Sequence, residues 1–185
     1  GAITLSNMGT LMGAGKALTL GGSTGGTLAS IIGTGTGSLT KQGSGTWTLA
    51  GANTYTGATT LSGGTLQITG TLGASASYTG AISIASGATF RHSSASNQSL
   101  GGVISGSGAV TKDTSSVSTL TLSGTNTYTG ATTISAGTLQ VGNGTTGSLG
   151  SGAVTIGSVG TLAFNLSGGA TPTNAFTGTS GATLS

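Results

Sequence analysis

The sequence predicts an all-β protein, a single-stranded parallel β-helix (β-solenoid) with about three short strands in each coil. Two observations predict this fold class. Apolar residues recur in short alternating bursts, such as 2–5 (AITL) and 81–84 (AISI), and no window of 11 or more residues carries a helical period. Long stretches of the chain also repeat one another, which is typical of solenoids.

The expected strands are only three to five residues long and are separated by Gly, Ser, Asn and Thr. Their centres fall near Leu39, Leu49, Leu61, Leu66, Ile82, Phe90, Val103 and Val110. Strands this short, with turns this varied, do not suit hairpins, which join longer strands through two-residue turns. In a parallel coil one residue of each alternating pair stacks inward, and glycine serves corners that need positive φ. With roughly 24 residues a coil, we expect seven or eight coils.

The long repeat recurs at an offset of about 72. The block 53–60 (NTYTGATT) returns unchanged at 126–133, an offset of 73 (126 − 53), and the lysines that precede the two blocks, Lys41 and Lys112, have an offset of 71 (112 − 41). The second copy differs by a Ser-rich insertion over Asp113 to Ser118. We therefore predict one continuous solenoid over 1–185, with long repeats of about 1–79, 80–151 and 152–185 (partial), cut from a longer array. At roughly 24 residues a coil, one repeat would be about three coils.

Composition excludes most site chemistry. Charged residues make up 3% of the 185 residues, with one Asp, one His, no Glu and no Cys. A pair of catalytic carboxylates cannot be built, and calcium and transition-metal sites lack ligands. We expect no enzyme activity, cofactor or metal. The net charge of +3 comes from scattered residues, so no basic patch for nucleic acid forms, and no apolar run is long enough to insert into a membrane.

Few residues qualify as candidate sites. The offset between His92 and Asp113 is 21 (113 − 92), which could place them on neighbouring coils, and both are interpreted as solvated turn residues. Asn53 and Asn126 are expected at corners, bonding turn backbone. Tyr55 and Tyr128 occupy equivalent places and are expected at a corner or at a stacking position of the solenoid, with carbohydrate binding as the alternative. Three Asn-x-Ser/Thr sequons are possible glycosylation sites, namely Asn97, Asn143 and Asn165.

The segment from Leu39 to Ile68 resembles the passenger-associated transport repeat of bacterial autotransporters. The matching positions are Lys41, Gly43, Gly45, Thr46, Thr48, Leu49, Gly51, 53–57, 59–61 and 64–66, and the second copy matches from Leu120 to Val141. The resemblance implies a right-handed parallel β-helix displayed outside a Gram-negative cell, exported with the help of a C-terminal barrel that lies outside this sequence. It also implies that the repeat assists coil-by-coil folding during export.

We therefore expect a structural stalk or filament segment at the bacterial cell surface, acting in adhesion, biofilm or fibre formation. A surface with so little charge is poorly protected from association. We expect lateral or end-to-end self-association, or contact with surface molecules and glycans. The alternative function is a carbohydrate- or ice-binding solenoid. Ice binding is disfavoured because Thr-x-Thr triplets such as 46–48, 54–56 and 119–121 do not recur at one spacing.

Overall fold

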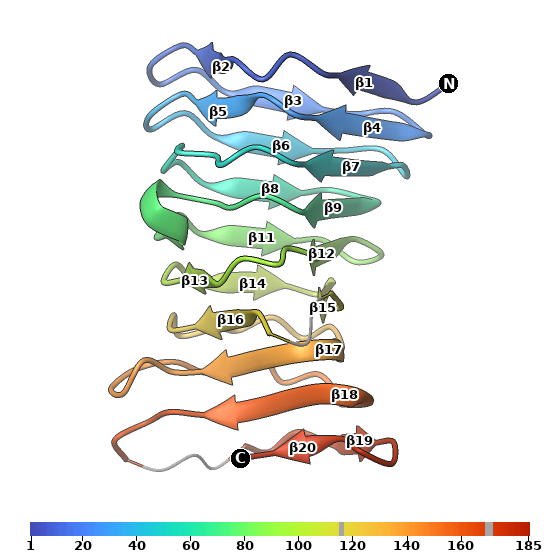
Figure 1. The fold of residues 1–185 in the computed structure, drawn as a ribbon, viewed down its shortest axis with the longest axis vertical. Helices are drawn as coiled ribbons and strands as arrows, with labels where there is room; N and C mark the ends of the chain where they lie inside the picture. The colour runs from blue at the N-terminus through green and yellow to red at the C-terminus, as the bar shows by residue number, and fades with distance from the viewer. Residues whose placement is uncertain (115–116, 169–171) are drawn as a thin grey trace.

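The computed structural model is a stack of about eight parallel coils with three short strands in each (Figure 1). It describes residues 1–114, 117–168 and 172–185. The predicted β-solenoid is thereby confirmed. Within the described residues no helix is long and apolar enough to cross a membrane. The Ser-rich insertion predicted at 113–118 lies partly outside the described residues, since 115 and 116 are not among them.

The chain passes three faces in a fixed order, and each face is a column of parallel strands. Face 1 is a five-stranded sheet of β3 (Leu18–Leu20), β6 (Leu39–Lys41), β8 (Thr59–Leu61), β11 (Ile82–Ile84) and β14 (Ile104–Gly106). Face 2 contains β1 (Ile3–Leu5), β4 (Gly25–Leu28), β7 (Thr46–Leu49), β9 (Thr65–Ile68), β12 (Thr89–His92), β15 (Ala109–Lys112) and β19 (Phe176–Gly178).

Face 3 contains β10 (Ser77–Tyr78), β13 (Gln98–Leu100), β16 (Thr119–Leu122) and β20 (Thr183–Leu184). At its N-terminal end β2 (Thr10–Met12) pairs with β5 (Ile31–Gly33), and the next coil stacks on β5 as extended backbone, where the amides of Thr54 and Tyr55 donate to Ile32 O. β17 (Thr132–Val141) and β18 (Val154–Phe164) each run from face 2 to face 3, which joins the two columns into one 13-stranded sheet. A short 3₁₀ turn, η1 (Ala74–Ala76), precedes β10.

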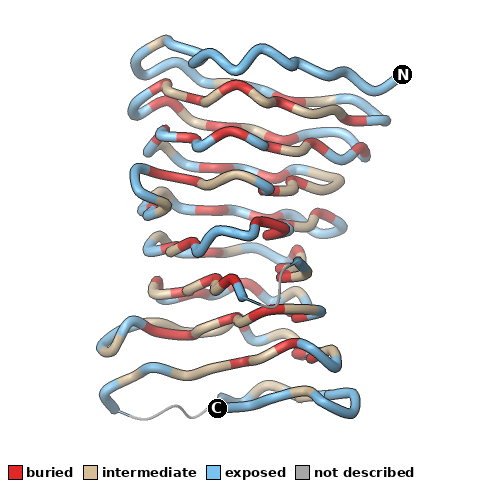
Figure 2. The backbone as a smooth tube through the Cα atoms, viewed as in Figure 1, coloured by how far each residue is buried: buried red, intermediate tan, exposed pale blue. Residues whose placement is uncertain are grey.

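The interior follows from the alternation of residues along each strand. In β9 and β16 every second side chain is fully buried, and register stacks these positions, for example Leu28, Leu49 and Ile68 on face 2. Figure 2 shows buried and exposed residues alternating around successive coils. One continuous apolar column therefore runs through the solenoid, and each coil is stabilised mainly by its two neighbours.

The coils differ in length, and most are shorter than expected. Register partners on face 2 have sequence offsets that run from 19 (65 − 46) to 24 (89 − 65), and the other offsets lie between 20 and 23. The corners absorb the difference, so strands stay in register while the sequence spacing varies.

The long repeat is consequently out of phase with the coils. Starting from Lys41, the register partners on face 1 are Leu61, Ile84 and then Gly106, so three coils correspond to an offset of 65 (106 − 41). Lys112 lies one strand further on, in β15 on face 2. The repeat thus advances three coils plus one face, not three coils, and its two copies point in different directions.

Candidate functional site

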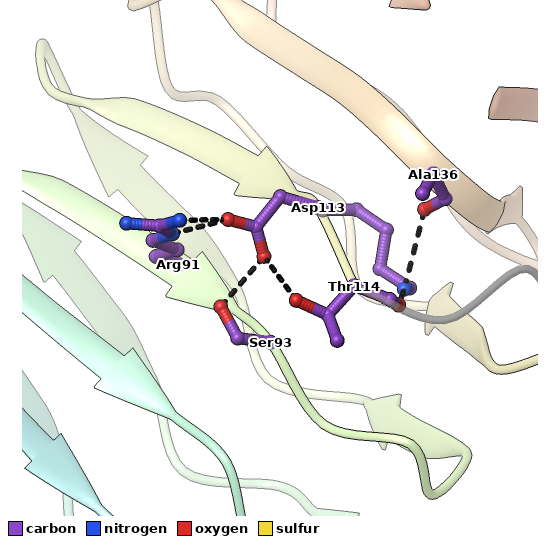
Figure 3. A network of polar contacts seen from close by, with 6 residues as sticks. Arg91, Ser93, Asp113, Thr114 and Ala136 are labelled. Carbon is purple, nitrogen blue, oxygen red and sulfur yellow. Dashed lines mark hydrogen bonds and ion pairs between the residues drawn. The ribbon is translucent and has the colours of Figure 1, made fainter. Parts of the chain in front are cut away.

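Four of the chain's few charged or imidazole side chains lie together on face 2. β12 ends in Arg91 and His92, and β15 ends in Lys112 with Asp113 just after it; the register pairs His92 with Lys112. The alternation of the strand separates the cluster into two parts. Arg91 and Asp113 meet at the surface, while His92 and Lys112 are fully buried. Figure 3 shows the outer part from close by.

Asp113 is held by three side chains. Arg91 forms an ion pair with it, Ser93 Oγ donates to its Oδ1 at 2.6 Å, and Thr114 Oγ1 donates to the same oxygen at 3.1 Å. Burial alone would raise the pKa of the Asp113 carboxyl, but these hydrogen bonds and the Arg91 charge outweigh it, so the pKa lies below its usual value. The expectation of a solvated turn residue is therefore wrong for Asp113.

The same expectation is wrong for His92. Its side chain is fully buried in the interior column, between its register partners Ile68 and Lys112. Neither ring nitrogen has a hydrogen-bond partner among the described residues. Burial first, and the Lys112 charge second, lower the pKa of the imidazole to about 4. Asp113 is engaged by Ser93 and not by the imidazole, so the described side chains form no Ser-His-Asp relay.

Both repeat lysines lie inside the solenoid, with their ammonium groups against corner carbonyls. Lys41 Nζ donates to the carbonyls of Gln42 (3.0 Å), Gly43 (2.8 Å) and Gly63 (2.9 Å). Lys112 Nζ donates to the carbonyls of Thr114 and of Ala136, the latter at 3.3 Å. Each lysine thus ties a corner of its own coil to the corner of the next, and burial lowers the pKa of both amines. We call these arrangements the lysine clamps.

Tyr55 and Tyr128 are fully buried in the interior. Tyr55 OH shares a hydrogen bond of 2.7 Å with Thr59, whose hydroxyl also meets Tyr78 OH at 2.7 Å, and the rings of Tyr55 and Tyr78 lie 5.4 Å apart. Tyr128 OH repeats the contact to Thr132 at 2.7 Å. A fully buried ring offers no face to a sugar, so the structure corrects the candidacy of both tyrosines as carbohydrate platforms.

Asn53 and Asn126 occupy equivalent positions in the two repeat copies and make equivalent hydrogen bonds. Asn53 Oδ1 accepts from Ile32 N at 2.9 Å and Asn126 Oδ1 accepts from Ile104 N at 2.7 Å, so both pair with backbone of the preceding coil. The sequon residues Asn97, Asn143 and Asn165 are exposed. Their glycosylation stays a prediction.

Sequence reasoning missed the lysine clamps and the buried histidine. The alternation of inward and outward residues along each strand predicts that both lysines point inward, because Lys41 and Lys112 stand two residues after the inward Leu39 and Val110. A lysine is nevertheless normally expected at the surface, since burying an ammonium is costly unless it is hydrogen-bonded. In the described residues no group of three or more His, Cys, Asp or Glu is placed to hold a metal ion.

The fold and its contacts define a repeat protein of the β-solenoid class, with polar side chains used mainly to join coils. Comparison of the sequence with protein families adds the type of repeat. The passenger-associated-transport-repeat matches residues 39–68 and 117–141, and each matched segment contains one of the buried tyrosines, Tyr55 or Tyr128. The chain is an autotransporter-passenger-like repeat protein. No curated protein and no solved structure matches it.

Proposed function

We propose that this chain is a rigid, non-catalytic segment of a secreted passenger displayed at the cell surface, serving as stalk or filament in adhesion, biofilm or fibre formation. The observation that carries the proposal is the apolar column, continuous through about eight coils and locked at intervals by the lysine clamps. Since each coil adds about 4.8 Å, the segment sets a fixed distance of about 40 Å.

The passenger-type repeat supports a role in export as well. A coil is stabilised chiefly by contact with its neighbour, so each coil that emerges can dock on the one before it. The clamps suit this order because Lys41 Nζ finds two carbonyls within its own corner and the third, Gly63 O, in the coil that follows. Each repeat would then close a folded unit of several coils.

Lateral self-association is the second part of the proposal, and it is supported by two flat arrays of small, uncharged side chains. Outward positions of face 1 carry an uncharged residue, which is Ala or Ser in four coils and Val in the fifth, and a hydroxyl two residues later: Ala17 and Thr19, Ser38 and Thr40, Ala58 and Thr60, Ala81 and Ser83, Val103 and Ser105. Four further coils repeat the pattern on face 2: Ala109 and Thr111, Ala131 and Thr133, Ala153 and Thr155, Ala175 and Thr177. A second copy has the same rise per coil, so the two arrays can pack rung on rung.

Two measurements test the proposal. Small-angle scattering of the purified segment should give a rod, and antibodies to the segment should label unpermeabilised cells of the producing bacterium; a globular scattering profile or label only after permeabilisation would refute the displayed stalk. For self-association, sedimentation velocity should show concentration-dependent growth that Thr60→Lys on face 1 suppresses. The matched control is Thr46→Lys, an exposed threonine of β7 on face 2 outside both arrays.

A further inference from the structure

Face 3 carries a groove of about 420 Å³ that the structural role does not use. Its floor is a ladder of outward side chains in register across four coils, Ser77, Ser99, Thr121 and Gln140. Beside this ladder lie Asn97 and Thr119, and the wall is the 3₁₀ turn η1, drawn in Figure 1 as the green coiled ribbon. The volume falls in the range of small-ligand sites.

The wall is held in an unfavourable backbone conformation. Ser75 and Ala76 both have positive φ, 53° and 57°, a region that non-glycine residues avoid. Two such residues in succession persist only where the surroundings impose them.

The buried amide of Gln98, 2% exposed, is hydrogen-bonded to this turn. Its Oε1 accepts from Leu72 N at 2.8 Å, and its Nε2 donates to Leu72 O and to Ala76 O, both at 2.9 Å. Gln98 thus fastens the turn at both ends. The groove wall is therefore fixed before any ligand arrives, which reduces the entropic cost of binding.

The chemistry of the lining selects the ligand. Every polar side chain in the groove is a hydroxyl or an amide, able to donate and accept, and none is ionisable. A phosphate would require cations or a nest of amides, and a peptide partner would require an apolar pocket for an anchoring side chain. A neutral oligosaccharide matches the lining, since its hydroxyls also donate and accept and are spaced regularly along a chain.

We propose that this groove, floored by Ser77, Ser99, Thr121 and Gln140 and walled by η1, is a binding site for a neutral oligosaccharide. The inference goes beyond the proposed stalk function and is independent of it, because the stalk is tested by scattering and cell labelling. It also places carbohydrate recognition on face 3, away from the buried Tyr55 and Tyr128.

The test is a glycan array of neutral and acidic oligosaccharides, with each positive glycan titrated calorimetrically against variants. Ser99→Arg fills the floor and should weaken binding at least tenfold, and Thr121→Arg should do the same one coil further on. Thr48→Arg is the matched control, because Thr48 is the outward, half-buried third residue of a four-residue strand on face 2, as Thr121 is on face 3, and it lies outside both arrays. Circular dichroism and thermal midpoints establish that each variant is folded.

Gln98→Leu probes the wall and leaves the side chains of the floor unchanged. We expect weaker binding from a folded protein, since the turn loses the amide that fixes it. Absence of any neutral glycan signal overturns the proposal. So does a signal that survives both Ser99→Arg and Thr121→Arg, one that Thr48→Arg abolishes equally, or one confined to acidic glycans.

Discussion

His92 and Lys112 are register partners on adjacent parallel strands, β12 and β15, and both side chains point into the interior with no exposed surface. The ammonium of Lys112 reaches corner carbonyls, but the imidazole has no hydrogen-bond partner among the described residues. The only histidine of the chain is therefore neutral in the folded protein and lies beside a positive charge.

This pair predicts a loss of stability in mild acid. The pKa of His92 is about 4 in the folded state and about 6.5 in an unfolded chain, so between these values the unfolded state takes up a proton that the folded state refuses. Stability should fall as the pH drops from about 6.5 to about 4, by up to roughly 3 kcal/mol. Urea titrations at several pH values measure this loss of unfolding free energy.

The control for this prediction is His92→Leu, which should flatten the dependence between pH 6.5 and 4. The remaining decline below about pH 4 belongs to Asp113, whose lowered pKa makes its contribution disappear as the carboxylate is protonated. An unchanged slope in His92→Leu would show that another group titrates in this window.

The lysine clamps should contribute measurably to stability. Lys41→Met keeps an unbranched apolar side chain but leaves the carbonyls of Gln42, Gly43 and Gly63 without the ammonium that now joins them. We expect a loss of about 2–3 kcal/mol, because hydrogen bonds to charged groups are strong and three of them are lost together. The free energy of unfolding of Lys16→Met, at an exposed lysine, should change little. Equal or greater stability of Lys41→Met would mean that desolvating the ammonium outweighs its bonds.

The two tyrosine sites permit a paired comparison. Thr59 Oγ1 bonds two phenols, those of Tyr55 and Tyr78, whereas the equivalent Thr132 is bonded to Tyr128. Replacing each threonine by valine preserves shape and removes the hydroxyl. Thr59→Val should cost about 1 kcal/mol more than Thr132→Val, the net value of one additional hydrogen bond. Chemical denaturation of both variants measures the difference; equal losses would show that the bond from Tyr78 OH to Gly57 O already satisfies the second phenol.

Close stacking of corners predicts which glycines are irreplaceable. A Cβ added at Gly57 would lie 2.3 Å from Gly37 O in the preceding coil, and backbone cannot move aside cheaply. We expect Gly57→Ala to destabilise the fold by about 1–3 kcal/mol. At Gly101 the nearest atoms are 3.7 Å away, so Gly101→Ala serves as the control in thermal melts. A midpoint unaffected by Gly57→Ala would contradict the tight corner.

The architecture followed from the sequence because short alternating bursts, glycine corners and a long repeat each point to stacked coils. The phase of the long repeat relative to the coils could not be predicted, because the corners contain a varying number of residues. Thr19, Thr40 and Thr60 are in register although their offsets differ, 21 (40 − 19) against 20 (60 − 40), so regular arrays are hidden in an irregular spacing. The groove was equally hidden, since Ser77, Ser99 and Thr121 become neighbours only through that register.

The burial of polar residues in the interior was the other feature that could not be predicted from the sequence. Gln98 and His92 fit the inward positions of their strands, but propensity places them outside, and only the carbonyl and amide groups of adjacent corners explain why Gln98 lies within. For the imidazole of His92 the described residues offer no such compensation.

Because the passenger-type repeat advances by three coils plus one face, successive copies of it are rotated about the axis of the solenoid. Each duplication of such a unit lengthens the shaft and also turns the duplicated motif by a third of a revolution. Three duplications would return it to its starting direction after ten coils, about 48 Å further along. A gene that grows by copying this unit would thus build a shaft presenting the same surface to every side, whereas a whole number of coils would have repeated it along one edge.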